Sequence, residues 1–182
     1  MVGGIKTKDL DFELREKIIK LALLQHHKEY EHGKMGPDTF DCAGLVWYIY
    51  NSLFNINIFK DGYGLSTTTK IMTSSYGQLK IFKKDIKKDL SNIRNGDIVL
   101  FHRQSLSDNE PKINNKYPGH CGIYIGEKKF IHASRSKGKV IISNFDKNKW
   151  FDTLVGNKDI VSDKSLVKVK KFMEDNNAID IA

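Results

Sequence analysis

The chain has 182 residues, a net charge of +8, and 40% hydrophobic and 29% charged residues. This length suits one domain with a sizeable core, and the composition excludes a disordered chain. No apolar run in the sequence approaches the length of a membrane span. The positive charge favours a polyanionic partner, but the basic residues are scattered singly and in pairs, which argues against nucleic-acid binding. We therefore treat residues 1–182 as one domain.

The first third of the chain predicts two helices separated by a loop. In residues 9–25, leucine, isoleucine and alanine side chains recur at helical spacing. Residues 31–40 contain two glycines and a proline, which predict a loop. Asp41 is a suitable N-cap for a second helix that runs to about Phe54. Because this second helix is apolar on nearly every side, we expect it to be buried.

The remainder of the chain predicts mainly strands. A short helix is expected over 68–77, and a long polar loop over 103–118. Short runs rich in β-branched and aromatic residues, separated by turn residues, indicate antiparallel strands. The predicted strands are 97–102, 120–126, 129–134, 139–145 and 166–172. Helices followed by an antiparallel sheet predict the α+β class.

Cys42 stands at the start of the second predicted helix. If Asp41 caps that helix, Cys42 lies in its first turn, where unpaired backbone N–H groups and the helix dipole favour a thiolate. A catalytic nucleophile needs this position, whereas a core cysteine does not. Cysteine is also among the most buried residue types, so position alone leaves both interpretations open.

A thiolate nucleophile needs an imidazole beside it, and two histidines lie in one predicted hairpin. With a three-residue loop at 126–128, Gly122 pairs with His132, and both histidine rings share a face within hydrogen-bonding reach. A two-residue loop would place His132 on the face opposite to His120. Cys121 points away from His120 and is predicted to be a small core residue. His26, His27 and His32 are predicted to be surface residues, with a place in a cleft beside the loop before Cys42 as the alternative for His32. His102 is predicted to be structural.

Four segments, in this order, resemble the NlpC-type cysteine peptidases: "FDCAGLVWYIY", "NGDIVLF", "PGHCGIYIG" and "FIHAS". Members of this family are papain-like enzymes that cut the peptide stems of bacterial cell walls. The resemblance extends over about residues 30–172, which leaves 1–8 and 173–182 as candidate flexible ends of a single catalytic domain. It implies N-terminal helices packed on a five- or six-stranded antiparallel sheet, with the nucleophile at the N-terminus of the central helix.

The resemblance also implies roles for individual residues. Cys42 would be the nucleophile, His120 the base and His132 the group that orients His120. Tyr30, in "YEHGKMGP", matches a family tyrosine whose hydroxyl faces the cleft, and the backbone N–H of Cys42 would contribute to the oxyanion site. No metal or cofactor is implied. The expected reaction is hydrolysis of the bond between γ-D-glutamate and a diamino acid, through an acyl-enzyme on Cys42.

The sequence departs from the family pattern at several places. Ala43 replaces the usual serine, and "LSTTT" occupies a segment where the family often has Pro-Arg. Cys121 stands where the family usually has valine. The loop at 103–118 is long, and such loops line clefts and influence specificity. Substrate preference is therefore the property least defined by the resemblance.

Other functions remain open from the sequence. The same Cys–His pair would serve an acyltransferase or amidase acting on a lipid or another amide, and an inactive site would leave a wall-binding module. The expected partner is cell-wall peptidoglycan, and the expected place of action is the bacterial envelope or the exterior. The N-terminus shows no secretory signal, so we expect either a trimmed enzyme or a phage-type delivery route. The oligomeric state is not indicated.

Overall fold

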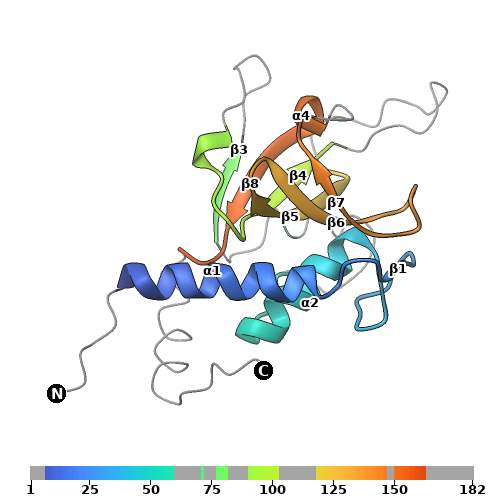
Figure 1. Cartoon of the computed structure of the whole chain (residues 1–182), viewed down its shortest axis with the longest axis horizontal. Helices are drawn as coiled ribbons and strands as arrows, with labels where there is room; N and C mark the ends of the chain where they lie inside the picture. The colour runs from blue at the N-terminus through green and yellow to red at the C-terminus, as the bar shows by residue number, and fades with distance from the viewer. Residues whose placement is uncertain are drawn as a thin grey trace.

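The computed structural model describes residues 7–59, 71, 77–81, 90–102, 118–146 and 150–162. Two helices lie against one face of a curled sheet, with α1 running beneath the strands and α2 beside it (Figure 1). Within the described residues, no helix is long and apolar enough to cross a membrane. The helices are α1 (Thr7–Leu23), α2 (Cys42–Phe54), the 3-10 helix η1 (Leu90–Asn92) and the short α4 (Trp150–Thr153).

The described residues form a sheet of eight strands in the order β2-β1-β7-β6-β5-β4-β8-β3. All neighbouring strands are antiparallel except the short pair β1 and β2, which is parallel. The strands are β1 (Glu29–Tyr30), β2 (Thr39–Phe40), β3 (Gln78–Ile81), β4 (Ile98–Phe101), β5 (His120–Gly126), β6 (Lys129–Ser134), β7 (Lys139–Asn144) and β8 (Leu154–Asp159). The α+β class is confirmed, but the expected five or six strands were too few.

The strands predicted between residues 97 and 145 are present as β4 to β7. Both long helices are also present, and α1 begins and ends about two residues earlier than expected. The strand predicted at 166–172 lies outside the described residues. The loop predicted at 103–118 and the helix predicted at 68–77 also lie outside them, apart from Pro118, Ile71 and Gly77.

The strand β8 was not predicted because its sequence, LVGNKD, is rich in residues that are rare in strands. All six of its residues are nevertheless buried, since β8 lies between β4 and β3. A Cβ atom on Gly156 would lie 2.1 Å from the backbone oxygen of Lys80 on β3. Glycine at this position therefore allows β3 to pair with β8, and tertiary packing outweighs the low strand propensity.

The helix α2 is buried, as its composition predicted. Its N-cap is Asp41, whose carboxylate accepts from the backbone N–H of Gly44 at 2.8 Å. The second carboxylate oxygen accepts from the N–H of Gly33 at 3.0 Å, which ties the preceding loop to the helix. A Cβ on Gly44 would lie 2.0 Å from the backbone oxygen of Lys34, so glycine is required where this loop crosses the first turn. Cys42 lies between Asp41 and Gly44, so these contacts fix its position in the first turn of α2.

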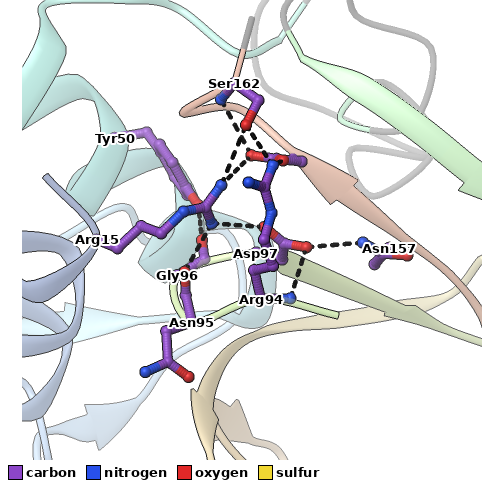
Figure 2. A network of polar contacts seen from close by, with 9 residues as sticks. Arg15, Tyr50, Arg94, Asn95, Gly96, Asp97, Asn157 and Ser162 are labelled. Atoms are coloured by element: carbon purple, nitrogen blue, oxygen red, sulfur yellow. Dashed lines mark hydrogen bonds and ion pairs between the residues drawn. The ribbon is translucent and has the colours of Figure 1, made fainter. Parts of the chain in front are cut away.

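A buried polar network connects α1 to the sheet (Figure 2). Arg15 of α1 donates to Asp97 at 2.9 Å and to Asp159 at 2.8 Å, and Asn157 donates to the other Asp97 oxygen at 2.7 Å. Arg94 also pairs with Asp159. Asp97 is the aspartate of the "NGDIVLF" segment and is 1% exposed. The network therefore joins the N-terminal helix to the beginning of β4 and the end of β8.

The two faces of the sheet carry two separate apolar clusters. The face toward α1 and α2 is aliphatic, and it includes Leu100, Cys121 and Ile131. The opposite face is rich in aromatic residues, among them Phe101 and Phe130. Because side chains alternate along β5, Cys121 belongs to the first cluster and its neighbour His120 to the other face.

Candidate active site

Cys42 is the first residue of α2 and is half-buried. The Asp41 cap confirms the expected location of the thiol in the first helical turn, near the positive end of the helix dipole. The beginning of β5 packs against α2, and the Sγ of Cys121 lies 3.4 Å from the backbone oxygen of Cys42. This contact places the thiol of Cys42 next to the strand that begins with His120.

The hairpin between β5 and β6 has the predicted register, although its loop differs. Ile123 pairs with Ile131 and Tyr124 with Phe130, which is the alignment that a three-residue loop would give. The connection is instead a two-residue turn at Glu127 and Lys128, both with positive φ, and Ile125 lies at an irregularity in the pairing. The additional residue on β5 offsets the shorter turn, so the histidines still share a face.

The expected ring-to-ring hydrogen bond is present. His120 Nε2 lies 2.8 Å from His132 Nδ1, and His132 Nε2 lies 2.9 Å from Ser143 Oγ. Only one of the two facing ring nitrogens can carry the proton. When His120 is an imidazolium, its Nε2–H donates to Nδ1 of His132, whose own proton is then on Nε2 and is donated to Ser143. Nδ1 of His120 is then the nitrogen available to Cys42.

The electrostatic environment favours the thiolate form of Cys42. The pKa of the Cys42 thiol is held well below its usual value by a hydrogen bond with the Cys121 thiol and by the charge and hydrogen bond of His120, against the opposing effect of burial. Burial also holds the pKa of His132 well below its usual range, and the charge of His120 adds to this effect. His132 therefore stays neutral, which leaves its Nδ1 able to accept a hydrogen bond from Nε2 of His120.

Aromatic rings surround the histidine pair. Trp150 of α4 stacks on His120 with ring centroids 5.4 Å apart, and its edge meets His132 at 5.1 Å. Phe130 stacks on His132 at 4.8 Å. These rings cover the hydrogen bond between the histidines, which strengthens it by lowering the local dielectric constant. Sequence reasoning missed both Trp150 and Ser143, because neither belongs to a motif and each reaches the site only through tertiary packing.

The other predicted residues lie at varying distances from this centre. Tyr30 is half-buried on β1 and packs against the cluster around α2. His32 is exposed, with Nδ1 3.9 Å from the Asp41 carboxylate. The rings of His26 and His27 contact each other, at a centroid distance of 3.8 Å. In the part of the chain that the structure describes, no group of three His, Cys, Asp or Glu residues could hold a metal ion.

Comparison with known proteins gives a consistent family. The model of the NlpC/P60 family matches residues 27–159. Murein DD-endopeptidase MepS/Murein LD-carboxypeptidase of Escherichia coli (strain K12) is 32% identical over 155 residues, which cover 81% of this chain and 68% of the relative. Gamma-DL-glutamyl hydrolase of Bacillus subtilis (strain 168) is 25% identical over 158 residues, covering 84% of this chain and 32% of that protein.

The fold is also shared with a solved structure. NlpC1 from Trichomonas vaginalis superposes with a TM-score of 0.60 and 25% identity, covering 80% of this chain and 44% of the other. Several relatives are much longer than this chain, which spans 49% and 47% of the length of two further curated relatives from Escherichia coli.

Proposed function

This chain belongs to the NlpC/P60 family, and we propose that it is a cysteine peptidase that cuts peptide stems of bacterial peptidoglycan. The proposal rests on three neighbouring residues: Cys42 with a lowered pKa at the start of α2, His120 hydrogen bonded to His132, and His132 itself, which is buried and neutral. A nucleophile, a base and a group that orients the base are the parts required for acyl transfer by a thiol. The name of the relative MepS supports a murein substrate, and the name Gamma-DL-glutamyl hydrolase supports cleavage at a γ-glutamyl bond.

In the proposed reaction, the Cys42 thiolate attacks the peptide carbonyl and forms an acyl-enzyme. The backbone N–H of Cys42, at the N-terminus of α2, and the hydroxyl of Tyr30 stabilise the oxyanion. The proton on Nδ1 of His120 passes to the leaving amine, and the neutral ring then takes a proton from the water that hydrolyses the acyl-enzyme. His132 keeps the His120 ring in the orientation that both steps need.

We propose the bond between γ-D-glutamate and the diamino acid as the site of cleavage. The alternative is the DD bond of the cross-link, which the name of MepS indicates for that relative. Action at the bacterial envelope follows from the substrate, and the net charge of +8 favours association with an acidic wall.

Digestion of purified muropeptides, followed by mass spectrometry, tests the function and the bond together. In uncross-linked stems, fragments that end at glutamate identify the γ-D-glutamyl bond, whereas loss of only the terminal residue identifies an LD-carboxypeptidase. Cleavage confined to cross-linked dimers identifies the DD bond. All of these products should be absent with Cys42→Ala. Absence of any cleavage by the wild-type chain, or undiminished cleavage by the variant, would contradict the proposal.

Thiol alkylation tests the chemistry without a wall substrate. Because the pKa of Cys42 is lowered, its thiolate persists below the pH range of a free cysteine, and alkylation by iodoacetamide should slow only as the pH falls through that lowered pKa. Cys121 is the internal control, since it is fully buried and should react slowly. Rapid alkylation without wall cleavage would favour an acyltransferase or amidase instead.

A further inference from the structure

A second cysteine, Cys121, lies next to the proposed nucleophile Cys42. Cys121 directly follows His120 on β5, but its side chain points to the opposite face, toward α2. Its Sγ donates to the backbone oxygen of Cys42 at 3.4 Å. Neither cysteine is part of a disulfide. The proposed peptidase reaction uses the sulfur of Cys42 and gives the sulfur of Cys121 no bond to form.

Cys121 packs as a small core residue, and it also brings a reactive group next to Cys42. Cys121 is completely buried in the aliphatic cluster beside α2. Valine, which stands here in the family pattern, would fill a similar volume without reactive chemistry. Burial also prevents large reagents from reaching Cys121 directly. Its sulfur instead lies against Cys42, at 3.4 Å from the backbone oxygen of that residue.

We propose that Cys42 and Cys121 form a reversible oxidation site, in which a hydroperoxide oxidises Cys42 and Cys121 then closes a disulfide with it. The deprotonated sulfur of Cys42 is the more reactive partner, and it is half-buried rather than enclosed. Cys121 is the resolving thiol. Because the Cys121 sulfur already lies 3.4 Å from the backbone oxygen of Cys42, we expect rotation of the side chains to be sufficient to bring the sulfurs to bonding distance.

Two balanced steps describe the reaction with hydrogen peroxide. The Cys42 thiolate attacks one peroxide oxygen, the O–O bond breaks, and a sulfenic acid and hydroxide form, with sulfur oxidised by two electrons. The Cys121 sulfur then attacks the Cys42 sulfur, the S–O bond breaks, and the displaced hydroxide leaves as water with the Cys121 proton. An external dithiol reverses the process by thiol–disulfide exchange, which restores both cysteines.

The consequence for activity rests on the proposed function, whereas the oxidation chemistry does not. A disulfide removes the nucleophile and should switch the peptidase off under peroxide. It also protects Cys42 from irreversible oxidation to the sulfinic and sulfonic acids. Mass readouts therefore test the oxidation site even if the chain cleaves no wall peptide.

The experiment compares the wild-type chain with Cys121→Val after treatment with increasing hydrogen peroxide. Intact mass spectrometry should show that the wild type loses two hydrogen atoms and gains no oxygen, and peptide mapping should identify a Cys42–Cys121 cross-link. The valine variant should instead gain oxygen on Cys42, first as a sulfenic acid that dimedone captures. Dithiothreitol should restore activity fully to the oxidised wild type but not to the variant after excess peroxide.

The peptide map of the wild type needs no variant, so the test stands even if Cys121→Val folds poorly. Wild-type protein that gains oxygen on Cys42 while Cys121 remains a free thiol would overturn the proposal. The proposal would also be overturned if no peroxide concentration oxidised the wild-type protein while free cysteine, treated in the same way as a control, was oxidised. If the cross-link forms in a chain that cleaves no muropeptide, the oxidation site stands and the peptidase assignment fails.

Discussion

Replacing His132 tests whether its hydrogen bond to His120, rather than its bulk, supports the reaction. His132→Leu fills the aromatic surroundings but removes the acceptor that lies 2.8 Å from His120 Nε2. His132→Asn is the matched variant, because an asparagine oxygen occupies nearly the position of the lost Nδ1. Both variants remove the hydrogen bond from His132 Nε2 to Ser143. The difference in activity between the two variants therefore reports on the hydrogen bond to His120.

The magnitude follows from the charge on the donor. A hydrogen bond to a charged group contributes about 1.5–3 kcal/mol. Since about 1.4 kcal/mol corresponds to a tenfold change in rate, loss of the bond should lower kcat/KM roughly 10- to 150-fold in His132→Leu. His132→Asn should retain most of the activity. Ser143→Ala removes only a neutral hydrogen bond to His132, of about 0.5–1.5 kcal/mol, and should cost a few-fold.

The assay is kcat/KM on a purified muropeptide, together with the rate of Cys42 alkylation near neutral pH. Near-ultraviolet circular dichroism checks that Trp150, which contacts both histidines, remains packed. Equal losses in the leucine and asparagine variants, with folding intact, would show that the hydrogen bond does not orient His120. An undiminished rate in His132→Leu would remove His132 from the mechanism altogether.

Three further replacements test the packing that supports the site. Arg15→Met leaves the buried Asp97 without its cation and should lower the free energy of unfolding, measured in urea, by about 3–5 kcal/mol. Because burial raises the pKa of Asp97, this loss should shrink as the pH falls and the carboxylate is protonated. A loss that does not vary with pH would contradict this reasoning. Gly44→Ala, whose Cβ would meet backbone, should cost about 1–3 kcal/mol in thermal unfolding, and an unchanged Tm would show that the loop relaxes freely. Trp150→Leu removes the ring stacked on His120 and should lower kcat/KM roughly 2- to 30-fold, from a cation–π contribution of about 0.5–2 kcal/mol, with little change in Tm.

Local patterns in the sequence predicted the elements that carry the triad. The apolar run after Asp41 predicted a capped, buried helix with Cys42 in its first turn. Alternation along β5 and β6 predicted that His120 and His132 share a face, and the observed pairing has that register. These features depend on residues close together in the chain, since the two histidines are only 12 positions apart.

Contacts between distant segments were decided by the tertiary structure. Arg15 and Asp159 are 144 positions apart, and neither belongs to a pattern that indicates its partner. The strand β8 has low strand propensity and forms because β3 and β4 pair with both of its edges. Ser143 and Trp150 reach the histidines, and Cys121 reaches Cys42, only after the sheet has closed around them. Propensity and capping act over a few residues, whereas a side chain's partner across the fold is determined by how complete elements pack.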